Sequence, residues 1–299
     1  MLPPGGSDRA EDALRLSRSL FPDLAQRYDA ALARATARSG AAGPGDLHAP
    51  WARFDDDLDA AAQDRFAGAG FASIPDSPGR RQLAHDFATA QRVARELLRL
   101  PGSGVPEPEA FAAAGVDLAA LVAKLDAARP DAALTAVWAP HGLDADVWRA
   151  AFARAAALPG SAFVPAGSAG SDDPTLSLGR DVEAEFARLN LPAGEALVVG
   201  DAPAWTLRLI PSEPIPEALG LNFTHGAPHV GLAEMLMLQL MRAIEAAPPL
   251  DQNSLTWLAG SWADGRLAAR HVYDAGRIRI TAREVGSQGP HLGARRPVA

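Results

Sequence analysis

Apolar residues are spaced as on helix faces through the first quarter of the chain. Between Asp8 and Gly40 a leucine or tyrosine recurs at every fourth position, which is the repeat of an amphipathic helix. A second stripe runs from Trp51 to Phe66 with three-four spacing and is followed by Gly68, a residue that commonly ends helices. We therefore expect helical segments over most of this stretch.

The most regular stripe begins at Ser77, which favours the N-cap position, and is followed by Pro78, which fits the first helical position. Its apolar residues continue at helical spacing to Leu97. One or two shorter helices are indicated between Phe111 and Ala128. Together these patterns predict a helical region over residues 1–128.

Beyond residue 129 the pattern changes to the alternation that is typical of strands. Ala132 to Trp138 is rich in strand-forming residues, and Trp205 to Ile210 alternates between the two faces of a strand. Glu195 to Val199 is a second strand-like run joined to it by a short GDAP turn. We expect these last two runs to form an antiparallel hairpin.

A second hairpin is predicted near the C-terminus. Arg266 to Tyr273 and Arg277 to Glu284 flank a short turn over Asp274 to Gly276, in which the glycine suits the left-handed position of a bulged hairpin. Sequential hairpins with few helices predict an α+β fold, with a mainly antiparallel sheet covered by helices over residues 129–299.

Two histidines precede a helix that is apolar around almost its whole circumference, from Gly231 to Ala247. His225 and His229 have the i, i+4 spacing of a helical metal site, but the glycine and the proline between them make a continuous helix unfavourable. Three interpretations follow. The histidines belong to an ordinary turn, bind an organic anion together with the helix-start amides, or bind a metal ion with Glu234 as a third ligand.

Three arginines alternate with aliphatic residues on the last hairpin. Arg277, Arg279 and Arg283 share one face of the predicted strand, and Arg295 and Arg296 follow in the tail. Such a face is either an ordinary solvated surface or a site for an acidic protein or a small anionic ligand, because guanidinium groups bind carboxylates and phosphates in a directed way.

Composition narrows the function classes. The chain has 299 residues, of which 48% are hydrophobic and 21% charged, as expected for a folded protein with a core. It has no cysteine, which excludes disulfides, thiolate metal sites and cysteine nucleophiles. Alanine is abundant and Lys124 is the single lysine, which suggests a GC-rich bacterial genome. No secretory signal or membrane span is recognisable, so we expect a cytoplasmic protein that does not bind membranes.

The charge is unevenly distributed. The net charge is −8, which argues against generic nucleic-acid binding. From Arg266 onward, however, the sequence contains seven arginines and only two acidic residues, Asp274 and Glu284. An acidic body thus carries a basic C-terminal region. The Asp55, Asp56, Asp57 and Asp59 cluster is explained by the preference of acidic residues for a helix start.

Motifs for catalysis are missing from the sequence. It contains no GxSxG elbow, phosphate-binding loop, dinucleotide-binding glycine motif or SxxK, and we expect no cofactor. The first hypothesis is therefore a partner-binding or accessory protein, which uses the basic hairpin face or a groove between the two regions. The alternative is a metal- or histidine-dependent hydrolase around His225 and His229, to which His141 could contribute after its strand.

Overall fold

The computed structural model describes residues 74–101, 104–128, 133–167, 173–192 and 203–298. All of them belong to the second of two compact units, which span residues 1–58 and 59–299. The helices expected before residue 70, the aspartate cluster at 55–59 and the strand expected at 195–199 lie outside the described residues. The division of the chain at residue 128 stays a prediction.

The described helices include those predicted at 77–97, 111–128 and 231–247, whereas the helix at 180–189 was not predicted. The helices are α4 (Pro78–Arg92), its π-helical extension η1 (Val93–Leu97), α5 (Pro108–Ala113), α6 (Leu118–Ala127), α7 (Ala145–Ala156), α8 (Arg180–Leu189) and α9 (Leu232–Ile244). The start of α4 is as predicted, because the Ser77 hydroxyl accepts a hydrogen bond from the Arg80 amide at 3.1 Å. In the part of the chain that the structure describes, no helix combines the length and the apolar character that a bilayer crossing requires.

Eight strands form two sheets among the described residues. They are β1 (Leu134–His141), β2 (Leu176–Leu178), β3 (Ala204–Pro211), β4 (Ala218–Leu219), β5 (Leu255–Trp262), β6 (Leu267–Asp274), β7 (Arg277–Glu284) and β8 (Leu292–Ala294). β1 pairs with β3, and the larger sheet has the order β2-β7-β6-β5-β8-β4. β2–β7 and β5–β8 are parallel, whereas the other pairs are antiparallel. The expected α+β class is confirmed, with a mixed sheet.

The β6–β7 hairpin closes through a tighter turn than the sequence predicted. Asp274 pairs directly with Arg277, which leaves a two-residue loop of Ala275 and Gly276. Both loop residues have positive φ, 48° and 84°, as the twist-matched two-residue turn requires. Gly276 is needed for a second reason, since a Cβ there would collide with the side chain of Val164.

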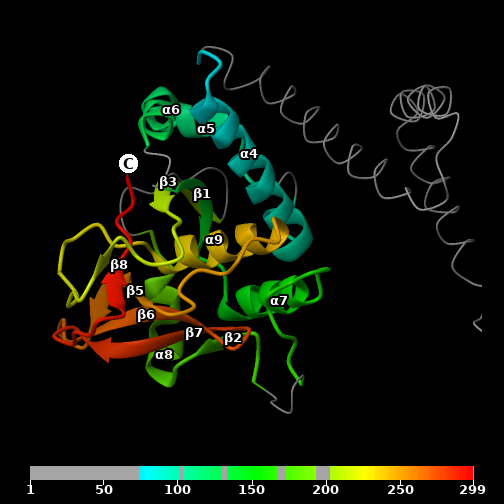
Figure 1. Cartoon of the computed structure of the whole chain (residues 1–299). Helices are drawn as coiled ribbons and strands as arrows, with labels where there is room; N and C mark the ends of the chain where they lie inside the picture. Colours follow the sequence, from blue (N-terminus) through cyan, green and yellow to red (C-terminus); the bar gives the residue numbers. More distant parts are fainter. Residues whose placement is uncertain (1–73, 102–103, 129–132, 168–172, 193–202, 299) are drawn as a thin grey trace, which may run out of the picture. The chain divides into compact units, whose positions relative to one another are not determined.

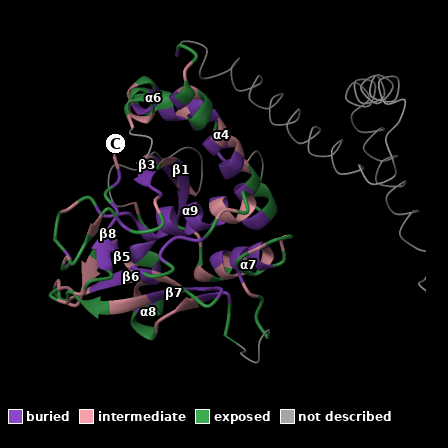
Figure 2. Ribbon diagram, viewed as in Figure 1, coloured by how far each residue is buried: buried purple, intermediate pink, exposed green. Residues whose placement is uncertain are grey.

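Helix α9 lies in the middle of the molecular core. Figure 1 shows it running between the small β1–β3 sheet and the larger sheet, with α4 and α7 on its other sides. Every residue from Leu232 to Met241 is buried, and Figure 2 shows the helix almost entirely in the buried colour. Contact on all sides explains why this helix is apolar around its circumference, and the predicted burial is confirmed.

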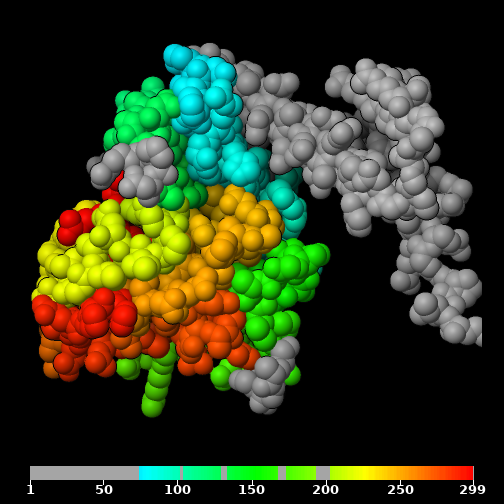
Figure 3. Space-filling view, viewed as in Figure 1, coloured from blue at the N-terminus to red at the C-terminus, as the bar shows by residue number. Residues whose placement is uncertain are grey.

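A smaller apolar cluster covers part of the face of the larger sheet that points away from α9. It consists of Phe223, Trp257, Ala268 and Leu292. The segment that contributes Phe223 is held to the sheet by a hydrogen bond from its amide to the carbonyl of Val285. In the space-filling view this yellow segment lies directly beside the red C-terminal strands (Figure 3). The remainder of that sheet face, on β6 and β7, carries the arginines.

Candidate functional site

Three arginines surround one threonine on the outer face of the β6–β7 hairpin. Arg270 of β6 pairs with Thr281 of β7, and Arg279 and Arg283 lie two residues before and after that threonine. Side chains two residues apart on a strand share a face, and diagonal cross-strand neighbours are about 7–8 Å apart. We call Arg270, Arg279 and Arg283 the arginine face.

The arginine face carries positive charge that is only partly balanced. The Arg270 Nε donates to the Thr281 hydroxyl at 3.0 Å. Arg279, with a side chain 42% exposed, lies 3.5 Å from Asp274 and 4.0 Å from Asp173. Arg283 is exposed and has no ion pair with any residue of the described ranges. Burial, and then the neighbouring Arg283 charge, lower the pKa of Arg270, so two cations lie close together without a shared acid.

Two of the arginines singled out in the sequence are buried. Arg277 is only 6% exposed, and its Nε donates to the carbonyl of Asp173 at 3.3 Å. Arg295 is completely buried in the core. Sequence analysis did not find Arg270, although its position follows from the two-residue turn, because pairing Asp274 with Arg277 places Arg270 opposite Thr281. The arginine face therefore lies farther from the hairpin turn than the sequence predicted, because Arg270 of β6 belongs to it and Arg277 beside the turn does not.

The two histidines before α9 contact the ring of Phe223 in different ways. His229 is buried and stacks on Phe223 at 4.7 Å between ring centroids, whereas the exposed His225 meets the same ring nearly perpendicularly at 5.3 Å. The His229 Nε2 donates to the carbonyl of Thr224 at 3.1 Å. Burial lowers the pKa of His229, which favours the neutral ring. The pair thus packs as a turn against the smaller apolar cluster.

Glu234 is occupied by other partners. Its carboxylate forms a two-pronged ion pair with Arg208, with 2.6 Å between Arg208 Nε and Oε1, and it accepts the Gly231 amide at 2.6 Å. Within the described ranges, no group of three or more histidines and carboxylates is placed to hold a metal ion. This arrangement gives the proposed His225, His229 and Glu234 site no support, and metal binding there stays a prediction.

His141 is buried at the end of β1 and both of its ring nitrogens have partners. Its Nδ1 donates to the carbonyl of Asn190 at 3.3 Å, and its Nε2 accepts from the Thr206 hydroxyl at 2.8 Å. Burial lowers the pKa of His141. A neutral ring with both nitrogens engaged joins α8 to the β1–β3 sheet, which is a structural role.

A buried polar network lies beneath α9, and no sequence pattern predicted it. Asp251 is 0% exposed and accepts hydrogen bonds from His271 Nδ1 at 2.8 Å and from Arg295 Nη2 at 2.6 Å. The Arg295 Nη1 donates to the carbonyls of Pro211 and Glu213 at 3.1 and 2.7 Å, whereas its buried Nε has no hydrogen-bond partner among the described residues. Burial alone would raise the pKa of Asp251, but His271 and Arg295 outweigh it and hold that pKa below its usual value.

The network also fixes the orientation of the His271 ring. Gln239 of α9 accepts from the Leu250 amide at 3.2 Å, which orients its amide group, so that its nitrogen donates to the Leu250 carbonyl at 3.1 Å and to His271 Nε2 at 3.2 Å. The His271 ring therefore accepts at Nε2 and donates from Nδ1. This histidine–aspartate pair has the hydrogen bonds of a catalytic dyad, but both residues are completely buried. Its role is to hold β6 and the segment around Asp251 together in the core.

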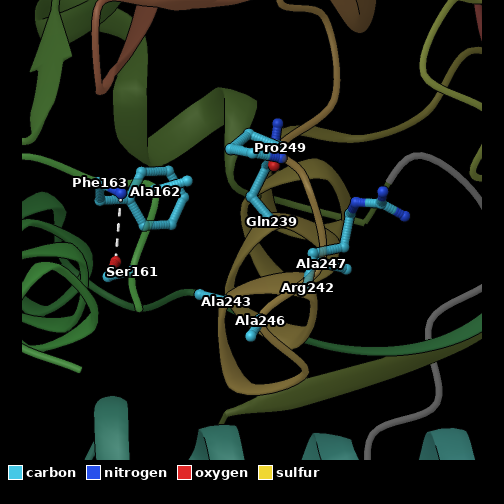
Figure 4. A pocket seen from close by; sticks show the side chains of 9 residues that line it. All are labelled: Ser161, Ala162, Phe163, Gln239, Arg242, Ala243, Ala246, Ala247 and Pro249. Carbon is cyan, nitrogen blue, oxygen red and sulfur yellow. Dashed lines mark hydrogen bonds between the residues drawn. The ribbon is translucent and has the colours of Figure 1, made fainter. Parts of the chain in front are cut away.

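A shallow recess opens at the C-terminal end of α9. It encloses about 220 Å³, part of it open to solvent, between Phe163 on one side and Arg242 and Pro249 on the other (Figure 4). Figure 4 shows the Arg242 side chain pointing away from Phe163, and its Nε donates to the carbonyl of Pro248 at 2.6 Å. Small-molecule sites have volumes of roughly 300–1,000 Å³ and polar groups that converge on the ligand. This recess is smaller, and its polar groups do not converge on its centre.

Comparison with known proteins gives no further guide to the site. No protein-family model matches the chain, and neither a curated protein nor a solved structure matches it.

Proposed function

We propose that the chain is a partner-binding protein, whose arginine face takes an acidic segment of another protein. The observation that carries the proposal is the pair of neighbouring cations Arg270 and Arg283, which lack a shared acid in the described part of the chain. Like charges side by side on a rigid surface are unfavourable in isolation and become favourable when a carboxylate lies between them. The cytoplasmic bacterial setting is part of this proposal.

The dimensions of the face favour several carboxylates over one small anion. Arg279 and Arg283 are four residues apart on a strand, which separates their backbones by about 13 Å. An acidic peptide can place a separate carboxylate at each of these arginines, which a single phosphate or carboxylate does not do. The net charge of −8 weakens any attraction to long nucleic acids. The partner class that fits is a protein segment with three or more acidic residues.

The experiment uses a fluorescein-labelled peptide of ten residues in which glutamate alternates with serine. We expect the intact chain to raise its fluorescence anisotropy at 20 mM NaCl and to bind it at least tenfold more weakly at 200 mM NaCl, because exposed charge pairs are screened. The double variant Arg270→Glu, Arg283→Glu should weaken binding at 20 mM NaCl by tenfold or more.

The matched control is the double variant Arg81→Glu, Arg92→Glu. Both of these α4 arginines are about as exposed as Arg279, with side chains 55% and 50% exposed, and the variant changes the net charge by the same amount. Equal weakening by the two double variants would overturn the proposal, because it would show a response to net charge alone. Competition by inorganic phosphate at low millimolar concentration would instead assign the face to a small anion.

One contact favours the alternative, a hydrolase. The Ser261 hydroxyl lies 3.3 Å from His225 Nδ1 near the protein surface, which is within the reach that a serine nucleophile and its base require. No described carboxylate bonds to this ring, so the third member of a triad is missing from the described residues. Fluorophosphonate labelling that disappears in Ser261→Ala would support hydrolysis, and unlabelled wild-type protein would exclude this serine as the nucleophile.

A further inference from the structure

A buried carboxylate joins α4 to the open edge of β1. Asp86 is 1% exposed, and its Oδ2 accepts the backbone amide of Ala136 at 2.7 Å. Its Oδ1 accepts from the side-chain amide of Gln82, also at 2.7 Å. Neither donor carries a charge. Asp86 is thus a buried carboxylate without a hydrogen-bonded cation.

The position of Ala136 in the sheet explains why its amide needs this partner. Ala136 pairs with Leu209, and Leu209 directs both its amide and its carbonyl toward Val298 on the far side of β3. In an antiparallel pair, both residues of such a position point their backbone groups away from each other. The Ala136 amide therefore faces α4, where Asp86 takes the place of a neighbouring strand.

Glu245, at the end of α9, faces the same junction. It accepts from the Thr89 hydroxyl at 3.1 Å and lies 3.2 Å from His85 Nε2. Its negative charge opposes ionisation of Asp86, whereas a protonated His85 favours it. β1 contributes no charged side chain between Leu134 and Pro140.

The other elements packed against α4 carry charges that have other partners or lie in solvent. α6 contributes Lys124 and Asp126, and the carboxylate of Asp126 accepts the Gly79 amide at 2.7 Å near the start of α4. η1 contributes Arg95 and Glu96, which are exposed. No cation from these elements is bonded to Asp86.

Burial, reinforced by Glu245, raises the pKa of Asp86 to about 7 despite the two hydrogen bonds that it accepts. The protonated carboxyl also fits its surroundings. One oxygen still accepts the Ala136 amide, and the hydroxyl can donate to Gln82 once that amide group turns over. Gln82 is exposed, so this rotation costs little.

We propose that Asp86 makes the docking of α4 on β1 a proton-controlled latch, which is closed while the carboxyl is protonated and opens more readily as it ionises. Opening lets the carboxylate reach water, and it frees the Ala136 amide at the edge of β1. Phe87 moves with the latch, because its ring lies 5.1 Å from Trp138 of β1 in the closed form.

The expected size follows from linkage. If the open form has the ordinary aspartate pKa of 3.8 and the closed form one of about 7, the opening constant rises about tenfold per pH unit between these values and levels off above them. The total increase between pH 5 and pH 8 is about a hundredfold. A structural carboxylate with an unperturbed pKa would give no rise in this range.

Hydrogen exchange of the full chain, followed by mass spectrometry at pH 5, 6, 7 and 8, tests the latch. After correction for intrinsic exchange rates, we expect amides of α4 and β1 to lose about a hundredfold of protection relative to those of β6. The variant Asp86→Asn imitates the protonated carboxyl and should show a flat profile. His85→Asn should keep most of the rise, which separates Asp86 from the nearby histidine.

Two results would overturn the proposal. One is constant protection of α4 in the wild type, and the other is the same rise in Asp86→Asn. If that variant does not fold, the carboxyl carbon of Asp86 can be titrated by NMR in the wild type. A midpoint below pH 5 would then show that the latch does not exist, whereas one between pH 6 and 8 would support it.

Discussion

Two aspartates of this protein are buried to the same degree and yet behave in opposite ways. Asp251 lies beneath α9 with 0% exposure, and Asp86 lies between α4 and β1 with 1% exposure. Arg295 and His271 hold the pKa of Asp251 below its usual value against the effect of burial, whereas burial raises the pKa of Asp86 to about 7. The difference shows that the hydrogen-bonding partners, and not burial itself, decide the charge of a core carboxyl.

The two aspartates therefore give opposite dependences of stability on pH. For Asp251 the folded pKa is lowered, so its contribution to stability is present above the unfolded value of 3.8 and is lost as pH falls through the folded pKa. For Asp86 the folded pKa is raised, so its contribution is complete below 3.8 and is lost as pH rises to about 7. The contribution of Asp251 is therefore lost in acid, below pH 3.8, whereas the contribution of Asp86 is lost between pH 3.8 and about 7.

The largest expected effect comes from removing the cation of the Asp251 network. Arg295→Met should lower the free energy of unfolding by about 3–5 kcal/mol, because it leaves a buried carboxylate without its ion-pair partner. Urea unfolding at pH 7 measures this loss. Arg296→Met, at the exposed neighbouring position, is the matched control and should change stability by less than about 0.5 kcal/mol. Similar losses in both variants would mean that the network contributes little.

A smaller effect is expected from neutralising Asp86. Wild-type stability should include a loss of about 2–3 kcal/mol between pH 5 and pH 7.5 that Asp86→Asn does not share. The reason is that the unfolded chain releases the proton of Asp86 at a lower pH than the folded chain does. Urea unfolding of both proteins at the two pH values gives the difference, and parallel curves for the two proteins would contradict the raised pKa.

The smallest effect should come from the donor to Asp86. Gln82→Ala removes one hydrogen bond and should cost about 0.5–1 kcal/mol, more at pH 8 than at pH 5, because hydrogen bonds to ionised groups are stronger. Gln91→Ala, in the same helix, is the control for the change in helix propensity. If the cost of Gln82→Ala is the same at pH 5 and pH 8, the ionisation of Asp86 does not change between them and the comparison between the two aspartates fails.

Local patterns predicted much of the secondary structure. Ser77 and Pro78 predicted the start of α4, and the apolar circumference of residues 231–247 predicted a buried helix. The order of the strands could not be predicted in the same way. The parallel pairs β2–β7 and β5–β8 join segments about 100 and 37 residues apart, and no local pattern records which distant segment will lie alongside.

The candidate site was only partly predictable, for the same reason. Alternation placed Arg277, Arg279 and Arg283 on one face of β7, but it did not show that Arg277 is held against Asp173 or that Arg270 joins the face from β6. The hydrogen-bonding partners of His225, His229 and Glu234 were equally hidden, because they come from segments up to 36 residues away.

By itself, the sequence determined the absence of thiol chemistry, the α+β class, the start of α4 and the location of the β6–β7 hairpin, because these depend on composition and on neighbours a few residues apart. Only the tertiary structure decided which charged groups are accessible, paired or protonated. Arg283 and Arg295 are both arginines of the basic C-terminal region, yet one is exposed and the other is enclosed by carbonyls and Asp251. Solvation and ionisation depend on what surrounds a side chain in space, and long-range packing sets those surroundings.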